Sequence, residues 1–104
     1  MLSKELKDEI IKRLVAKFDL DRIILFGSQA RGTANDKSDV DLLLVGKVNY
    51  DRFKMMTDAF RLLGKLKYAF DIIILTPDEF ENNKVIPGTT ARYAFKDGTI
   101  LYEK

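Results

Sequence analysis

Three aspartates and one Gly-Ser pair carry the chemistry that the sequence suggests. Gly27 and Ser28 follow a short apolar run. Asp39 and Asp41 stand two residues apart at the start of a second run, and Asp71 stands at the start of a third. Carboxylate oxygens are the ligands that Mg²⁺ and Mn²⁺ prefer, and Mg²⁺ completes its coordination shell with water and substrate phosphate oxygens. The three carboxylates therefore predict a site for two such ions that is open to a phosphate-bearing substrate.

The Gly27-Ser28 pair is suited to bind those phosphates. Glycine lets the backbone approach an anion without a Cβ in the way, and a short helix expected at 29–31 would direct free N–H groups toward it. Ser28 adds a hydroxyl donor. Arg31 offers a fork of donors either to phosphate or to one of the carboxylates, and its type and position leave both roles open.

Each of these signals also has an ordinary explanation. A Gly-Ser pair after a strand is most often a turn, and an aspartate at a strand start is most often a turn residue. The combination is more informative, because Asp41 and Asp71 border strongly apolar runs, where an unpaired carboxylate is costly. Competing motifs are missing, since the sequence has no ATPase P-loop and no G-x-G-x-x-G, and residues 35–41 lack the glycine of a calcium loop.

The composition excludes other kinds of chemistry. The 104 residues include no cysteine and no histidine, which removes disulfides, thiolate zinc sites and Ser-His-Asp triads. A content of 46% hydrophobic and 33% charged residues is typical of a globular protein, and the length predicts one domain over residues 1–104. No apolar run approaches the ~20 residues of a membrane span and no secretory signal is evident, so we expect a cytoplasmic protein without membrane contact. A net charge of +2 gives little support for nucleic-acid binding.

The elements that must position the candidate residues follow from the spacing of apolar side chains. Long helices are predicted at 3–18 and 50–66, with Ser3 and Asn49 as N-caps. Strands are predicted at 23–26, 39–45 and 70–75. After Thr76, a capping box and a proline predict a short helix, and a further helix from Thr89 or Thr90 to Lys96 precedes a short strand at 99–102.

The connections between the strands predict their arrangement. A long helix joins the second strand to the third, which is the pattern of a parallel crossover, whereas the dozen residues between the first and second favour an antiparallel pair. We therefore expect an α/β (α+β) fold with a mixed three-stranded sheet of order 1-2-3. In this topology Gly27, Asp39, Asp41 and Asp71 meet at one edge, and side-chain alternation puts Asp39 and Asp41 on the same face.

The letters G-S-Q-A-R-G at 27–32 and S-D-V-D-L-L at 38–43 resemble the nucleotidyltransferase superfamily that includes DNA polymerase β. More narrowly, they are similar to the minimal nucleotidyltransferase (MNT) proteins, and the likeness extends through F-D-I-I at 70–73 to the turn at 97–98. The resemblance implies an α-β-α-β-α-β core and transfer of a nucleoside monophosphate, with pyrophosphate leaving.

The resemblance also assigns roles to residues of this chain. It implies that Asp39 and Asp41 are metal ligands and that Asp71 is a third carboxylate, which helps to activate the acceptor hydroxyl. Gly27 and Ser28 would bind the β and γ phosphates of the nucleotide. The catalytic group implied by the resemblance is therefore the same set of carboxylates that the residue chemistry indicates.

A protein partner is a further implication of the resemblance. MNT proteins are typically paired with small helical HEPN proteins as antitoxins of toxin-antitoxin systems, and adenylylation of a toxin tyrosine is one mode of action. The expected function is thus metal-dependent transfer of AMP from ATP to a hydroxyl of a HEPN-type partner. Two alternatives stay open: a catalytically idle antitoxin that acts by contact alone, and a small-molecule nucleotidyltransferase of the aminoglycoside type. Assembly into a homo-oligomer is also left open.

Overall fold

The structure, a computed structural model, describes residues 2–27, 30 and 39–104. Within these residues there are four helices and four strands, in the order α1 (Lys4–Lys17), β1 (Leu20–Phe26), β2 (Val40–Gly46), α3 (Arg52–Leu63), β3 (Phe70–Leu75), α4 (Pro77–Asn83), α5 (Thr90–Asp97) and β4 (Thr99–Glu103). The candidate residues Ser28 and Arg31 lie outside the described residues, as does the helix predicted at 29–31 apart from Ala30. No helix in the described part of the chain is long and apolar enough to cross a membrane.

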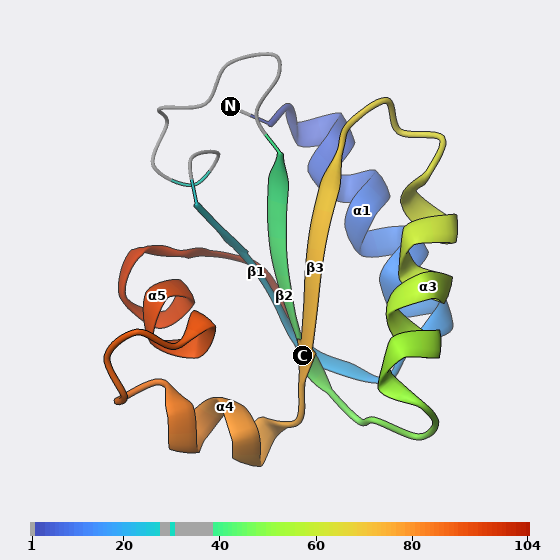
Figure 1. The fold of residues 1–104 in the computed structure, drawn as a ribbon. Helices are drawn as coiled ribbons and strands as arrows, with labels where there is room; N and C mark the ends of the chain where they lie inside the picture. The colour runs from blue at the N-terminus through green and yellow to red at the C-terminus, as the bar shows by residue number, and fades with distance from the viewer. Residues whose placement is uncertain (1, 28–29, 31–38) are drawn as a thin grey trace.

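The strands form one mixed sheet in the order β3-β2-β1-β4 (Figure 1). β1 is antiparallel to β2 and to β4, whereas β2 and β3 are parallel. The expected order of the first three strands and their directions are confirmed, but a sheet of only three strands is wrong. β4 pairs with the other side of β1, with Thr99 opposite Leu25, and thereby satisfies backbone groups that would otherwise form a bare edge.

Helices cover both faces of the sheet (Figure 1). One face, which includes Ile23 and Leu42, packs against α1 and α3. The opposite face, which includes Leu43, packs against α4 and α5 through Phe80 and Ala94. Because the central strands are buried on both sides, they consist of nearly continuous apolar residues rather than an alternating pattern.

The helix N-termini follow capping chemistry, with one correction. The Ser3 side chain accepts a hydrogen bond from the first turn of α1, as predicted. The predicted Asn49 cap is wrong: the helix is shorter than 50–66, and the Asp51 side chain accepts a hydrogen bond from the Lys54 N–H. Aspartate and asparagine are about equally good N-caps, so two candidates two residues apart could not be separated by residue type.

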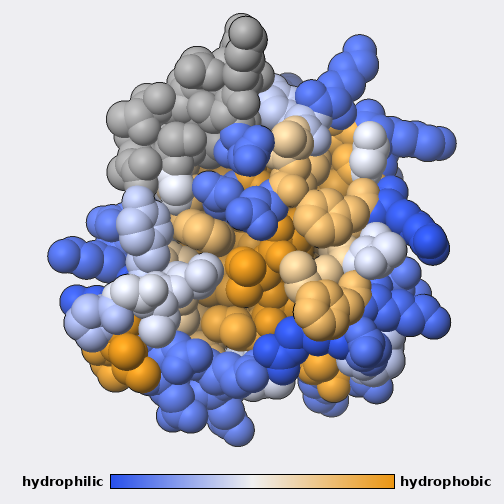
Figure 2. Space-filling model, in the orientation of Figure 1, coloured by the Kyte–Doolittle hydropathy of each residue, from blue (hydrophilic) through white to orange (hydrophobic). Residues whose placement is uncertain are grey.

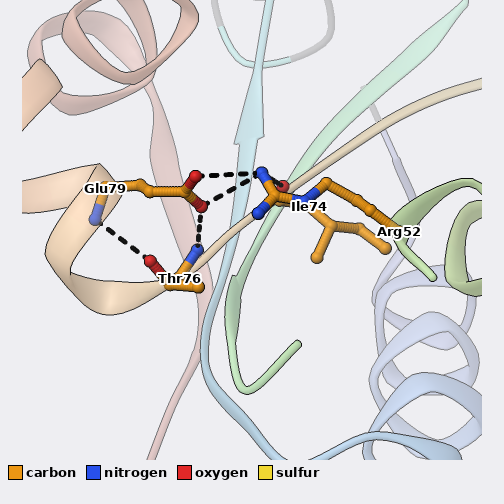
Figure 3. Close-up of polar contacts among 4 residues, drawn as sticks. All are labelled: Arg52, Ile74, Thr76 and Glu79. Carbon is orange, nitrogen blue, oxygen red and sulfur yellow. Dashed lines mark hydrogen bonds and ion pairs between the residues drawn. The ribbon is translucent and has the colours of Figure 1, made fainter. Parts of the chain in front are cut away.

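A polar network joins α3, β3 and α4 (Figure 3). Thr76 and Glu79 form the predicted capping box, in which the Thr76 N–H donates to Glu79 Oε1 at 2.8 Å and the Glu79 N–H donates to Thr76 Oγ1 at 3.2 Å. Arg52 Nη1 forms an ion pair with Glu79 at 3.0 Å and donates to the Ile74 carbonyl at 3.4 Å. The network connects the start of α3 to the end of β3 and to the first turn of α4.

We expect Glu79→Gln to reduce the loss of folding stability that occurs when the pH is lowered from neutral to acidic values. The hydrogen bond from the Thr76 backbone, followed by the Arg52 contact, lowers the pKa of the Glu79 carboxyl. A group with a lowered folded pKa stabilises the fold above its unfolded pKa, ~4.3, and this stabilisation is lost as the pH falls through the folded pKa. The Glu79 side chain is 38% exposed, so solvent screening limits the contribution to about 1 kcal/mol or less.

Urea unfolding at neutral pH and at about pH 3 measures this contribution. Glutamine keeps the capping geometry, so the loss of stability between the two pH values should be smaller in Glu79→Gln than in the parent. Glu5→Gln, an exposed change in the first turn of α1, is the control. An acid-induced loss as large in Glu79→Gln as in the parent contradicts the assignment.

Candidate metal and nucleotide site

Two of the three candidate carboxylates lie on adjacent strands in register. Asp41, near the start of β2, is the partner of Asp71, near the start of β3. On its other side Asp41 pairs with Phe26, the last residue of β1. Cross-strand partners are about 5 Å apart and present their side chains on the same face. Asp71, Asp41 and Phe26 therefore form a row across three strands.

This row lies on the face of the sheet that α4 and α5 cover. Two residues further along their strands, Leu43 and Ile73 belong to the apolar cluster of that face, as does Phe26 itself. The strand ends that carry the row extend beyond both helices (Figure 1). Asp41 is accordingly half-buried and Asp71 is exposed, which leaves the carboxylates accessible to a ligand.

Asp39 lies just before β2 and not within it. The predicted strand 39–45 begins instead at Val40, whose N–H donates to the Ala69 carbonyl at 2.8 Å. Asp39 is exposed. Among the described residues no three acidic side chains gather closely enough to form a metal-binding cluster. The fold thus brings two carboxylates together on adjacent strands and places the third directly before β2.

The paired carboxylates suit a hard divalent cation. Two neighbouring carboxylates repel each other unless a positive charge lies between them. Mg²⁺ usually takes only one or two protein carboxylates and keeps its other positions for water and phosphate oxygens. Asp41 and Asp71 are enough to supply these one or two carboxylates. Asp39 stands two residues before Asp41 in the chain.

Gly27 lies against the carboxylate of Asp41. Its φ is +74°, a left-handed conformation that costs roughly 1–2 kcal/mol for a residue with a Cβ. A Cβ at this position would overlap Oδ2 of Asp41. The glycine therefore permits both the turn after β1 and the close approach of the backbone to the carboxylate. It is also the first residue of the predicted phosphate-binding pair.

A cleft of about 580 Å³ adjoins the row on the side of α5. Its walls include Phe26 from β1 together with Arg92, Tyr93 and Lys96 from α5. The rings of Phe26 and Tyr93 meet edge to face, with centroids 6.3 Å apart and an interplanar angle of 69°. The sequence analysis did not predict this cleft. The one indication of it in the sequence is the aromatic residue Phe26 directly before Gly27.

Comparison with known proteins places the chain among nucleotide-transferring enzymes. The family model described as "Polymerase beta, Nucleotidyltransferase" matches residues 8–104. "Putative protein adenylyltransferase MJ0604" of Methanocaldococcus jannaschii is 35% identical over 96 residues, which cover 90% of this chain and 92% of the relative.

Two solved structures share the fold. A chain of a toxin-antitoxin complex with AMP-PNP has a TM-score of 0.71 at 23% identity, covering 94% of this chain and 73% of that chain. A chain of the tri-AMPylated Shewanella oneidensis HEPN toxin in complex with its MNT antitoxin has a TM-score of 0.66 at 19% identity, covering 99% of this chain and 74% of that chain. At these identities the two structures establish the common fold alone.

Proposed function

The chain belongs to the polymerase β-type nucleotidyltransferase family, and on this premise we propose that it transfers AMP from ATP to a hydroxyl of a HEPN-type protein partner. The observation that carries the proposal is the register of Asp41 with Asp71, beside the close approach of Gly27. Paired carboxylates next to a glycine turn supply, in one place, ligands for a cation and room for phosphate oxygens.

The reaction balances as a single displacement at the α-phosphorus. The acceptor oxygen forms a bond to this phosphorus, the bond to the oxygen bridging to the β-phosphate breaks, and pyrophosphate leaves. The hydroxyl proton passes to Asp71, because this carboxylate is the more exposed of the pair and stands on the edge strand β3. Asp39, Asp41 and Asp71 would hold Mg²⁺, and the ion when bound would supply positive charge against the phosphate oxygens.

The phosphate side of the site is assigned to the turn after β1. Gly27 gives the β and γ phosphates access to backbone N–H groups, and Ser28 adds a hydroxyl donor. Arg31 supplies a cation for the phosphates. The left-handed φ of Gly27 and its position against Asp41 support this assignment, since both bring the turn to the metal carboxylates.

A protein acceptor is supported by the surface and by the relatives. Figure 2 shows apolar surface in the region of β3 and α3, and α3 carries Phe53 at 81% and Phe60 at 41% exposure. Exposed apolar surface of this kind marks protein-protein contacts. The relative from Methanocaldococcus jannaschii is named as a protein adenylyltransferase, and one protein of the same fold forms a complex with an AMPylated HEPN toxin.

Position-specific labelling tests the reaction. The chain is incubated with Mg²⁺, a HEPN-type protein from the same genome and ATP labelled at either the α- or the γ-phosphate. We expect label on the partner only from the α-phosphate, and none when Mg²⁺ is removed with a chelator. Label from the γ-phosphate indicates a kinase and contradicts the proposal. Protection of cells without any labelling favours the idle antitoxin, and labelling of an aminoglycoside without a HEPN protein favours the small-molecule enzyme.

A further inference from the structure

We infer that this chain is also a substrate of its own reaction, with the hydroxyl of Tyr68 as the acceptor of AMP. The inference rests on the proposed function and deepens it, because it names an acceptor on the chain itself. In this step Oη of Tyr68 forms a bond to the α-phosphorus of ATP and the bond to the oxygen bridging to the β-phosphate breaks. Pyrophosphate leaves, and the phenol proton passes to Asp71.

Tyr68 lies at the end of the sheet that carries the candidate carboxylates. It belongs to the segment 64–69, which joins α3 to β3, and Figure 1 shows this segment at the end of the sheet where β1 ends and β2 begins. Its chain neighbour Ala69 accepts a hydrogen bond at 2.8 Å from the N–H of Val40, the first residue of β2. Tyr68 precedes Asp71 by three residues, so their Cα atoms are no more than about 11 Å apart. The phenol is therefore attached close to the carboxylate that takes the acceptor proton.

Tyr68 is also on the side of the site from which an acceptor has to approach. The β and γ phosphates are assigned to the turn after β1, and β2 separates β1 from β3. Asp71 on β3 is thus on the far side of Asp41 from that turn. In a displacement at phosphorus the attacking and leaving oxygens are roughly in line, on opposite sides of the phosphorus. An acceptor carried at the start of β3 enters opposite to the leaving pyrophosphate, as the reaction requires.

The other three tyrosines are less suited to this role. Tyr50 donates its hydroxyl hydrogen to Asp58 at 2.6 Å, and this hydrogen bond raises the pKa of the Tyr50 phenol. Tyr102 is half-buried and packs against the apolar cluster of the α1 and α3 face. Tyr93 lines the cleft on the β1 side of the site. Tyr68, by contrast, is 42% exposed, and exposed side chains change rotamer within nanoseconds, so its ring is free to turn toward a bound nucleotide.

Positive charge beside Tyr68 favours the modified product. Lys65 and Lys67 are exposed in the same segment. Within the described part of the chain, neither ammonium group forms an ion pair. AMP joined to a tyrosine keeps a negative charge on its phosphodiester, and a cation close to a phosphate oxygen stabilises it through charge-assisted hydrogen bonds. The two lysines are therefore placed to offset the charge that the reaction adds.

Incubation of the chain alone with Mg²⁺ and ATP, followed by mass spectrometry of the intact chain and of its tryptic peptides, tests the inference. We expect the parent chain to exceed the mass calculated from its sequence by one AMP group, and the Asp41→Asn chain to match the calculated mass. Trypsin cleaves after lysine and arginine, so each of the four tyrosines falls on a separate peptide. The modified peptide should be the one that begins at Tyr68 and ends at Lys84.

Tyr68→Phe removes only the acceptor oxygen, so it should carry no AMP and keep the melting temperature of the parent. Tyr102→Phe makes the same change on β4 and is the matched control, which should gain AMP as the parent does. A parent chain without AMP, AMP on a different peptide, or AMP on the Tyr68→Phe chain overturns the inference. Failure of the proposed function is distinguishable when a HEPN-type protein is added: a labelled partner beside an unmodified chain overturns the inference alone, whereas no label on either protein contradicts the proposed function as well.

Discussion

Asp41→Asn is expected to abolish nucleotidyl transfer while leaving the fold intact. Asparagine has nearly the same shape but lacks the charge with which the proposed site would bind a divalent cation. Losing several kcal/mol of transition-state stabilisation corresponds to a rate reduction of about 10³-fold or more. Asparagine also keeps the volume and the hydrogen-bonding capacity of the side chain, so the melting temperature should stay close to that of the parent.

The rate of AMP transfer and the thermal unfolding curve, measured on the same preparation, test both halves of this prediction. Asp8→Asn is the control, because it makes the same chemical change at an exposed position of α1, and it should retain the parent rate. An Asp41→Asn variant that keeps more than about a tenth of the parent rate is incompatible with a metal-binding role.

Gly27→Ala is expected to impair both stability and transfer. A residue with a Cβ is strained at a φ of +74°, and the added methyl group would overlap Oδ2 of Asp41. The backbone strain alone costs roughly 1–2 kcal/mol. Relief of the overlap has to move either the turn or the Asp41 carboxylate, so we expect a total loss of about 2–3 kcal/mol of unfolding free energy and a transfer rate at least tenfold lower.

Gly88→Ala separates the two contributions to the loss of stability. Gly88 also has a left-handed φ, +87°, but a Cβ there would meet no atom within 4 Å. Chemical denaturation of both variants should show the larger loss in Gly27→Ala, and the difference measures the cost of crowding Asp41. Equal losses contradict a close approach between Gly27 and the carboxylate.

The sequence was sufficient to predict most of the secondary structure and the meeting of Asp41 and Asp71 at one edge of the sheet. Both residues stand at the second position of their strands, and the helix between them favours a parallel crossover that aligns the two strand starts. The capping box at Thr76 and Glu79 was also predicted, because its hydrogen bonds join residues three apart. Signals of this kind depend on local spacing.

Other parts of the candidate site could not be predicted from local spacing. The strand at 99–103 was expected, but its place beside β1 depends on the return path that α5 takes over the sheet. The position of Asp39 outside β2 depends on where β2 begins to pair, at the hydrogen bond from Val40 to Ala69, the residue just before β3. The roles of Ser28 and Arg31 stay predictions, because both residues lie outside the described part of the chain.

By itself, the sequence determined which residues have the chemistry suited to metal and phosphate, and which strand ends carry them, because residue chemistry, periodicity and connection length are properties of the chain. Only the tertiary structure decided that Gly27 lies against Asp41 and that Phe26 and Tyr93 enclose a cleft beside it. These contacts join segments far apart in the chain, and they form only when α5 packs on the sheet and β1 ends at the level where β2 begins.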